Sequence, residues 1–254
     1  MPDRLDGTVA LVTGASSGIG ATTAVELARH GAAVALAARR ADRLDELAAR
    51  IRGDGGTAAV IPADVTSESE AGKLVERTVA ELGRLDTLIN NAGLMLLGPV
   101  VGARTDDWRR MVDVNVLGLM YCAHAALPHL LSAAQDSPRR VADIVNLSSV
   151  AGRIARNGSA AYNATKHGVG AFSEALRQEV AARHVRVSLI EPGVTETELA
   201  GHNRPEILEQ MNRRFGDIKR LQAVDIAESI GFIVTRPWHV IVSELMVRPT
   251  EQEG

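Results

Sequence analysis

Short apolar runs that alternate with longer helical patterns constrain the fold of this chain more than any other feature of its sequence. The runs predict strands, which we place at residues 8–12, 33–37, 58–61, 87–90, 144–147, 185–190 and about 240–247. They are mostly apolar on both faces, as strands of a buried parallel sheet are. Helical patterns fill the gaps, near residues 18–30, 42–52, 67–82, 106–131, 161–183 and 224–234.

Repeated strand–helix units predict an α/β fold, in which right-handed crossovers place helices on both faces of a parallel sheet. We expect a single doubly wound Rossmann domain with a seven-stranded sheet over residues 1–254, because 254 residues that are 46% hydrophobic suffice for one large core. Residues 195–216 interrupt the alternation on the side where strand carboxyl ends open, which predicts a substrate lid. The polar stretch Ser132–Arg140, which contains Pro138, predicts a surface loop.

The composition argues against several classes of function. A net charge of −3 gives no support to a nucleic-acid partner. The start of the chain lacks a basic region followed by an apolar stretch, so we expect no targeting segment there. The sequence has no run of about 18 apolar residues, so we expect no membrane span. The single Cys122, among apolar helical neighbours, predicts a buried thiol and fits a reducing, cytoplasmic location. His124, His129 and His184 form no cluster with acids, so no metal site is predicted.

A glycine-rich segment follows the first apolar run and opens the first helix. Its spacing is G-x-x-x-G-x-G, with glycines at positions 14, 18 and 20. Glycine permits a tight turn and a close approach of the backbone to a pyrophosphate, and the helix that follows directs free amides and its positive dipole end at the phosphates. The segment therefore predicts a dinucleotide site with contacts from Gly14, Ser16, Ser17, Gly18, Ile19 and Gly20.

The end of the second predicted strand distinguishes between the two nicotinamide cofactors. Enzymes that prefer NAD place an acid there, about 20 residues past the loop, to bind the ribose hydroxyls. This chain has Ala38, Arg39 and Arg40 instead, and a guanidinium binds a 2′-phosphate well, so NADPH/NADP+ is the predicted cofactor. Either arginine could be a solvated charge, and Arg40 is the stronger candidate for that. Asp64 and Val65, after the third strand, are placed to contact the adenine, although Asp64 could instead cap the next helix.

Further motifs follow in order along the chain. They are Asn90-Asn91-Ala92-Gly93, Asn115, Ser148-Ser149, Tyr162-x-x-x-Lys166 and Pro192-Gly193. With the glycine-rich segment, they make the chain resemble the short-chain dehydrogenases/reductases over nearly its whole length. Stretches at 95–99, 172–180 and 248–250 resemble NADPH-dependent members in particular. The resemblance implies a homotetramer built on the helices near 106–131 and 161–183.

The resemblance also implies roles for single residues. Lys166 would hold the nicotinamide ribose, and Asn115 would order a water beside Lys166. The adenosine ribose side of the site would be lined by Asn91, Ala92 and Gly93. The nicotinamide would be surrounded by Pro192, Gly193, Thr195 and Thr197. The family pattern has valine where this chain has Thr195; a backbone contact to the carboxamide survives that change, whereas a side-chain packing contact need not.

Tyr162, Lys166 and Ser149 predict proton transfer to or from a substrate oxygen. Lys166 lies one helical turn from Tyr162 on the same face. An ammonium, together with the positive nicotinamide of the oxidised cofactor, would lower the tyrosine pKa from its usual value of about 10. Ser149 would hydrogen-bond the substrate oxygen, and its thirteen-residue spacing from Tyr162 favours it over Ser148, which we expect to be a local backbone partner.

These residues together predict an NADPH-dependent oxidoreductase that reduces a ketone or aldehyde to an alcohol, reversibly, with Tyr162 as general acid/base. Three alternatives stay open: the oxidative direction, NAD as cofactor, and a cofactor-binding scaffold without turnover. Basic residues border the predicted pocket, and they could attract an anionic substrate or be solvated or make subunit contacts. They are Arg153, Arg156, Arg204, Arg213 and Arg214, with Asn157 between Ser149 and Tyr162.

Overall fold

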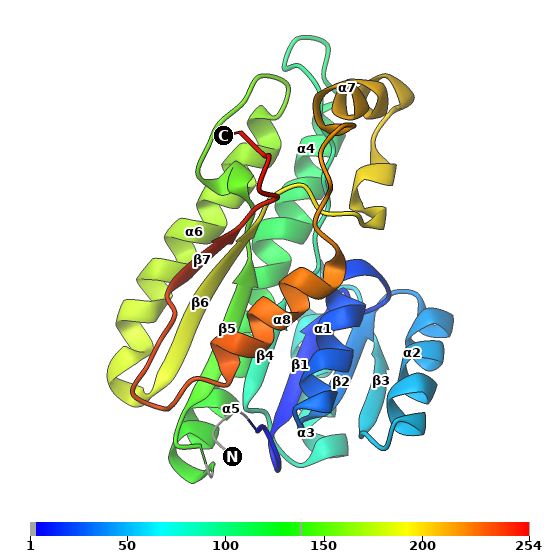
Figure 1. Cartoon of the computed structure of the whole chain (residues 1–254). Coiled ribbons are helices and arrows are strands. Elements are labelled where there is room, and N and C mark those ends of the chain that lie inside the picture. Colours follow the sequence, from blue (N-terminus) through cyan, green and yellow to red (C-terminus); the bar gives the residue numbers. More distant parts are fainter. Residues whose placement is uncertain (1–3, 138, 254) are drawn as a thin grey trace.

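The computed structural model describes residues 4–137 and 139–253, and within them seven parallel strands form one sheet in the order β3-β2-β1-β4-β5-β6-β7. The predicted α/β fold is therefore confirmed, and the sheet runs through the middle of the molecule (Figure 1). The strands are β1 (Val9–Thr13), β2 (Ala33–Ala38), β3 (Ala58–Pro62), β4 (Thr87–Asn90), β5 (Ala142–Leu147), β6 (Val185–Pro192) and β7 (Glu244–Val247).

Helices cover both faces of this sheet. The α-helices are α1 (Gly18–Arg29), α2 (Ala41–Gly53), α3 (Glu68–Leu82), α4 (Thr105–Val112), α5 (Leu119–Asp136), α6 (Ala160–Val180), α7 (Pro205–Phe215) and α8 (Ala223–Val234). Shorter turns are η1 (Asp113–Gly118), η2 (Val150–Gly152), η3 (Ala181–Arg183) and η4 (Glu198–His202). One core lies between the sheet and α1, α2 and α8, and the other lies between the sheet and α3, α5 and α6.

Strand β2 shows how the sequence builds two cores at once. Side chains alternate between the faces of a strand. Val34 and Leu36 therefore pack in the core beneath α1, α2 and α8, whereas Ala35 and Ala37 pack in the core beneath α3, α5 and α6. A strand buried on both faces has no polar positions to spare, which explains why these runs are recognisable in the sequence.

The predicted helix near 106–131 is a longer segment of three parts, α4, η1 and α5. The middle part is a π-helical turn that contains Asn115. By length and composition this 32-residue segment could cross a membrane, which the sequence reading did not anticipate. In the structure α5 packs on α3 and on the sheet, and burial raises the pKa of the Cys122 thiol to about 12. The predicted buried thiol is confirmed.

Two other expectations need correction. Residues 132–136 of the predicted surface loop belong to α5, because Ala133 and Ala134 continue its buried face; Pro138 lies outside the described residues. Residues 195–216, predicted to interrupt the strand–helix alternation, contain η4 and α7, a helix for which the sequence analysis gave no range. Pro205 begins α7 at a position where its missing N–H and fixed φ suit a helix, and Ile207 is the buried residue of that helix.

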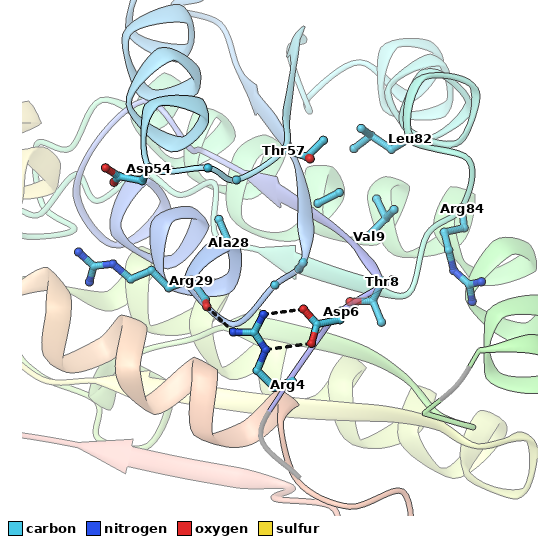
Figure 2. A pocket seen from close by; sticks show the side chains of 16 residues that line it. Arg4, Asp6, Thr8, Val9, Ala28, Arg29, Asp54, Thr57, Leu82 and Arg84 are labelled. Atoms are coloured by element: carbon cyan, nitrogen blue, oxygen red, sulfur yellow. Dashed lines mark hydrogen bonds and ion pairs between the residues drawn. The ribbon is translucent and has the colours of Figure 1, made fainter. Parts of the chain in front are cut away.

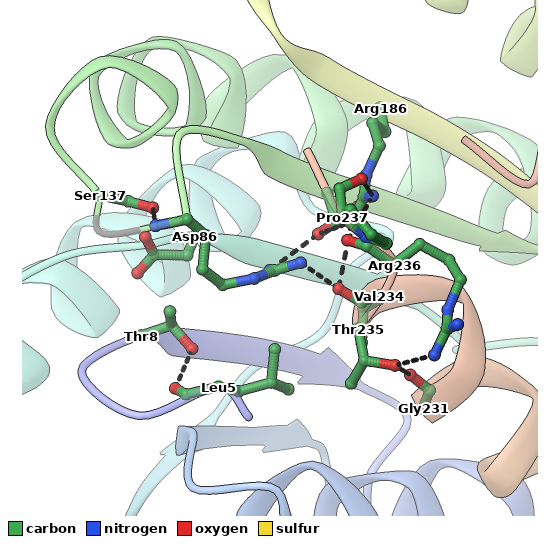
Figure 3. A network of polar contacts seen from close by, with 12 residues as sticks. Leu5, Thr8, Asp86, Ser137, Arg186, Gly231, Val234, Thr235, Arg236 and Pro237 are labelled. Carbon is green, nitrogen blue, oxygen red and sulfur yellow. Dashed lines mark hydrogen bonds and ion pairs between the residues drawn. The ribbon is translucent and has the colours of Figure 1, made fainter. Parts of the chain in front are cut away.

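Buried ion pairs tie the amino ends of the strands together. Asp143 on β5 accepts hydrogen bonds from Arg186 of β6 at 2.7 and 3.0 Å. Arg186 also donates to the carbonyl oxygens of Val234, the last residue of α8, and of Pro237 beyond it (Figure 3). Asp86, at the start of β4, accepts from the backbone N–H of Val9 on β1 at 2.9 Å. These contacts lie at the edge opposite the predicted site.

Candidate active site

The loops that leave the carboxyl ends of β1, β2, β4, β5 and β6 carry almost every predicted site residue. Because parallel strands end at the same edge of a sheet, these loops gather on one side of the molecule, where α7 and the start of α6 also lie (Figure 1). A surface cavity of about 660 Å³ lies elsewhere, at the amino end, beside the Arg4–Asp6 ion pair and Arg29 (Figure 2). It contains none of the predicted residues.

The glycine-rich loop is packed tightly against the end of β4. Gly14 has a φ of +66°, and a Cβ there would lie 2.8 Å from Cα of Ala92. A Cβ on Gly20 would overlap the side-chain amide of Asn91. That amide donates to the carbonyl oxygens of Thr13 and Gly14 at 2.9 and 3.2 Å. Gly14 and Gly20 are thus required by internal packing, and Asn91 holds the loop.

The start of α1 fits the phosphates of a dinucleotide. Ser17 is its N-cap residue in an extended conformation, and within the described part of the chain its side chain caps none of the first amides of the helix. Uncapped amides at a helix amino terminus bind anions. Gly18 has a φ of +54° and a Cβ there would lie 3.2 Å from Cγ2 of Thr197, so Thr197 passes directly across the loop.

Arg40 lies on the glycine-rich loop. Its guanidinium donates to Oγ of Ser16 at 3.0 and 3.2 Å and to Oγ of Ser17 at 3.0 Å. The same group pairs with Glu198 of η4 at 2.9 Å and lowers the pKa of that carboxyl. Within residues 4–137 and 139–253, the structure records no such contact for the side chain of Arg39, which is exposed. The sequence favoured Arg39 over Arg40 as the cofactor contact, and the choice between them stays a prediction.

The remaining predicted adenosine contacts have structural partners in the chain. Asp64 accepts hydrogen bonds from the backbone N–H and hydroxyl of Thr66 at 3.0 and 2.8 Å, which closes a turn. Ser67, not Asp64, caps α3. Val65 is buried in the core beneath α3 and α5. Ala92 donates its backbone N–H to Thr13 at 3.1 Å. Asp64 also donates its backbone N–H to Glu70 at 2.7 Å. The contacts of Asp64 and Val65 with the adenine stay predictions.

Tyr162, Ser149 and Lys166 lie together, as predicted. Ser149 caps η2 and hydrogen-bonds the Tyr162 hydroxyl. Nζ of Lys166 lies 5.9 Å from the centre of the Tyr162 ring and donates to the carbonyl oxygen of Leu147 at 2.8 Å. The hydroxyl of Ser148 donates to the backbone oxygen of Lys166 at 3.0 Å, so Ser148 is the backbone partner we expected.

Burial has the largest effect on the pKa values of Tyr162 and Lys166. It raises the pKa of Tyr162 to about 12, an effect that the hydrogen bond from Ser149 only partly offsets. Burial also lowers the pKa of Lys166 to about 8. We expected the ammonium to make the tyrosine more acidic; the opposite shift results because desolvation penalises both charged forms. The neutral phenol is therefore the form present at pH 7.

Asn115 holds the π-helical turn against the loop after β4. Its side chain accepts from the backbone N–H of Leu94 at 2.7 Å and donates to the carbonyl oxygen of Leu94 at 2.8 Å and to Thr165 at 3.1 Å. A Cβ on Gly93 would lie 3.6 Å from Oδ1 of Asn115 and 4.0 Å from Nζ of Lys166, so Gly93 separates the two side chains. The relay of a water between them stays a prediction.

The Pro192–Thr197 segment is held by the end of the chain. Gly193 donates its backbone N–H to the carbonyl oxygen of Val247 at 2.7 Å, and Val194 donates to the side chain of Gln252 at 2.9 Å. Thr195 donates its hydroxyl to the carbonyl oxygen of Gly193 at 3.0 Å. Thr197 caps η4. Sequence reasoning did not foresee that Gln252 supports this loop.

Asn203 is a second residue that sequence reasoning missed. It is buried, accepts from the backbone N–H of Leu97 at 2.6 Å and donates to the carbonyl oxygen of Met95 at 3.0 Å. These bonds fasten residues 195–216 to the apolar wall formed by Leu94–Leu97, which packs with Met111 and Tyr162. The partners are more than 100 positions apart, so no local pattern could have revealed them.

The lowered pKa of Lys166 makes stability depend on pH. Between about pH 8 and 10.5 the unfolded chain keeps a proton on this amine that the folded chain has lost, so the free energy of unfolding rises with pH. We expect Lys166→Met to be more stable than the wild type at pH 7, by about 2 kcal/mol, and the difference to shrink as the pH rises from 8 to 10. Urea unfolding of both proteins from pH 7 to 10 measures this. A pH-independent difference would contradict the buried ammonium.

Comparison with known proteins agrees with this geometry. The family model of the short chain dehydrogenases matches residues 8–208. An uncharacterized oxidoreductase of Staphylococcus saprophyticus is 38% identical over 248 residues, covering 97% of this chain and 99% of that protein. Among solved structures, the closed form of serine dehydrogenase complexed with NADP+ has a TM-score of 0.88 and 30% identity, covering 97% of both chains.

A second solved structure, a 3-ketoacyl-(acyl-carrier-protein) reductase from Brucella melitensis complexed with NADH, has a TM-score of 0.84 and 29% identity, covering 96% of this chain and 98% of that one. Each of these similarities covers nearly the whole chain. The chain therefore belongs to the short-chain dehydrogenase family and is an oxidoreductase of that type.

Proposed function

We propose that this oxidoreductase uses NADPH to reduce a ketone or aldehyde to an alcohol, reversibly, by direct hydride transfer. The observation that supports this most is the contact of Ser149 with a neutral, buried Tyr162 beside the glycine-rich loop. Ser149 would orient the carbonyl oxygen, and Tyr162 would give its proton to that oxygen. Bound NADPH would supply the hydride to the carbonyl carbon.

The raised pKa of Tyr162 fits the protonated form that the reduction of a carbonyl requires of its proton donor. A phenol with a pKa of about 12 is ready to donate a proton at pH 7, whereas oxidation of an alcohol requires it to lose that proton first. Lys166 and Asn115, which flank Gly93, would restore the proton after each turnover. Following NADPH consumption against a broad library of ketones and aldehydes tests the proposal. Tight cofactor binding without turnover on any of them would indicate a binding protein instead.

The preference for NADPH rests on Arg40. Its guanidinium lies between Ser16, Ser17 and Glu198, where the structure already holds an anionic oxygen. We propose that the 2′-phosphate replaces the Glu198 carboxylate on Arg40. Arg40 and Glu198 are both about half exposed, so this exchange needs no unfolding of the loop. The similar structures contain NADP+ in one case and NADH in another, so they support a nicotinamide cofactor of either kind.

Glu198→Gln should tighten the binding of NADP+ by about fivefold, because a neutral amide competes less well for Arg40 than a carboxylate does. NAD+ affinity should change less. Calorimetric titration with NADP+ and with NAD+ measures the two affinities. Glu196→Gln is the matched control, since Glu196 lies in the same segment and contacts Gln222. Unchanged or weaker NADP+ binding by Glu198→Gln would refute the exchange.

Residues 195–216 are proposed to form a substrate lid. Asn203 fastens them to the wall at Leu94–Leu97, and Thr197 and Glu198 cross the glycine-rich loop. The lid thus contacts both the cofactor loop and the apolar wall beside Tyr162. A lid in this position would cover the cofactor and the substrate together and keep water away from the hydride transfer.

We also propose a cytoplasmic homotetramer built on α4, α5 and α6. The apolar segment Thr105–Asp136 is only partly buried within one chain, which leaves apolar surface for a partner copy. Size-exclusion chromatography with light scattering tests the assembly. Within the family, residues 95–99, 172–180 and 248–250 resemble those of NADPH-dependent clavulanic acid dehydrogenase. This similarity supports membership of the same subgroup and leaves the substrate open.

A further inference from the structure

Arginines without acidic partners surround the proposed substrate site. Arg156 lies in the loop between Ser149 and Tyr162, and Arg204 and Arg214 lie in the lid. Within the described ranges, none of these three guanidinium groups pairs with a carboxylate. Their neighbours do: Arg153 pairs with Glu191 at 2.7 Å and also with Glu244, and Arg213 lies 3.8 Å from Glu209. The basic residues that sequence reasoning grouped together therefore fall into two classes.

Arg156 is the most unusual of the three, because Nη2 of its guanidinium is buried and has no hydrogen-bond partner among the described residues. Buried polar groups in proteins are nearly always paired, and a charged donor without an acceptor is unfavourable. Burial and the nearby charge of Arg214 both lower the pKa of Arg156. A site that brings two cations together and leaves one N–H unpaired is complementary to an anion.

The chain holds Arg156 in a fixed position relative to Tyr162. Asn163, the next residue after Tyr162 on α6, donates to the carbonyl oxygens of Ala151 and Ile154 at 2.6 and 2.9 Å. Its side-chain oxygen accepts from the backbone N–H of Arg156 at 3.2 Å. The loop is thus fastened to the helix that carries the proton donor. A group bound to Arg156 would be held at a set distance from the Tyr162 hydroxyl.

The lid meets the Arg156 loop at the loop that follows β4. Gly98 donates its backbone N–H to the carbonyl oxygen of Gly158 at 2.7 Å, which joins the loop after β4 to the Arg156 loop. A Cβ on Gly98 would lie 3.0 Å from Nη2 of Arg204, so this lid arginine rests on that junction. Three loops therefore meet beside the apolar wall, and two of them, the Arg156 loop and the lid, carry arginines that pair with no carboxylate among the described residues.

We infer that the carbonyl substrate carries a carboxylate, which Arg156 binds and Arg214 approaches from α7. The inference rests on the proposed reduction of a carbonyl and names its substrate class. A guanidinium matches a carboxylate with two parallel N–H···O bonds, and Nη2 of Arg156 supplies a donor that no protein group uses. The carboxylate would set the orientation of the substrate, while Ser149 and Tyr162 act on its carbonyl oxygen.

Paired substrates test this directly. We would measure NADPH-dependent reduction of keto and aldehydo acids of increasing chain length, each beside its methyl ester. The wild type should reduce at least one acid with a kcat/KM about 30-fold above that of its ester. Arg156→Gln should raise KM for that acid about 30-fold with little change in kcat, and leave the ester unaffected. Arg156→Lys should restore only part of the affinity, because an ammonium lacks the bidentate geometry.

Controls separate this inference from the proposed function. Arg213 is a lid arginine that lies beside Glu209. Arg213→Gln should leave the ratio of kcat/KM for the acid to that for its ester unchanged. If neither acids nor esters are reduced, the proposed function fails. If esters are reduced as well as acids by the wild type, only the carboxylate site is refuted. Should Arg156→Gln not fold, inhibition of ester reduction by benzoate in the wild type decides: inhibition competitive with the ester supports the site, and its absence refutes it.

Discussion

Tyr162→Phe should lose turnover by about 10³- to 10⁴-fold while its affinity for NADP+ changes by less than about threefold. The substitution removes one hydroxyl and keeps the ring, which is buried beside Leu94 and Met111. The hydroxyl is the acidic side-chain group that contacts Ser149, so without it the alkoxide formed by hydride addition loses the acid beside it. Steady-state kinetics on any accepted carbonyl, with a separate cofactor titration, measures both effects.

Tyr121→Phe is the matched control for this experiment. The chain has two tyrosines, and Tyr121 packs at the edge of the core beneath α5, away from Ser149. Removal of the Tyr121 hydroxyl should leave turnover within about twofold of the wild type. If Tyr162→Phe kept a tenth or more of wild-type turnover, another group would have to supply the proton, and the assignment of Tyr162 as general acid/base would be wrong.

Arg40→Ala should weaken the binding of NADP+ by about 30- to 150-fold and change that of NAD+ by less than about threefold. The expected loss corresponds to about 2 to 3 kcal/mol, the usual contribution of hydrogen bonds from a charged group. The effect is specific to NADP+ because only that cofactor carries a phosphate on the adenosine ribose. Fluorescence titration of the purified protein with each cofactor gives both dissociation constants.

Arg39→Ala decides between the two neighbouring arginines. The structure records contacts with Ser16 and Ser17 for Arg40, whereas the sequence alone favoured Arg39. We therefore expect Arg39→Ala to keep most of the preference for NADP+. If Arg39→Ala lost the preference and Arg40→Ala retained it, the reading from sequence would be right and the contacts of Arg40 would reflect only its interaction with Glu198.

The fold was predictable because the strands are buried on both faces. Val34, Leu36, Ala35 and Ala37 leave no polar position in β2, so its run stands out from its surroundings. Helix α7 was missed although Ile207, Leu208, Met211 and Phe215 recur at helical spacing, because the segment was taken as an interruption of the strand–helix alternation. Pro205 at its first position was a second local signal.

The site was predictable only in part, for a different reason. Tyr162 and Lys166 are close in sequence, and one helix turn brings them together. Glu198 meets Arg40 across 158 positions and Asn203 meets Leu97 across 106, so their pairing depends on the completed fold. The pKa of Tyr162 shifted against expectation because burial, which a spacing cannot show, outweighs the effect of the neighbouring ammonium.

Because of the buried Asp143–Arg186 network, the amino ends of the strands should tolerate amino-acid substitutions less well than the carboxyl ends. At the amino edge, one carboxylate joins β5 to β6 and, through Arg186, to the backbone that follows α8, so a substitution there would disturb several elements at once. At the opposite edge, the lid and the Arg156 loop are surface segments whose side chains can be replaced singly. New substrates could therefore be acquired by exchanging loops, while the register of the strands is inherited intact.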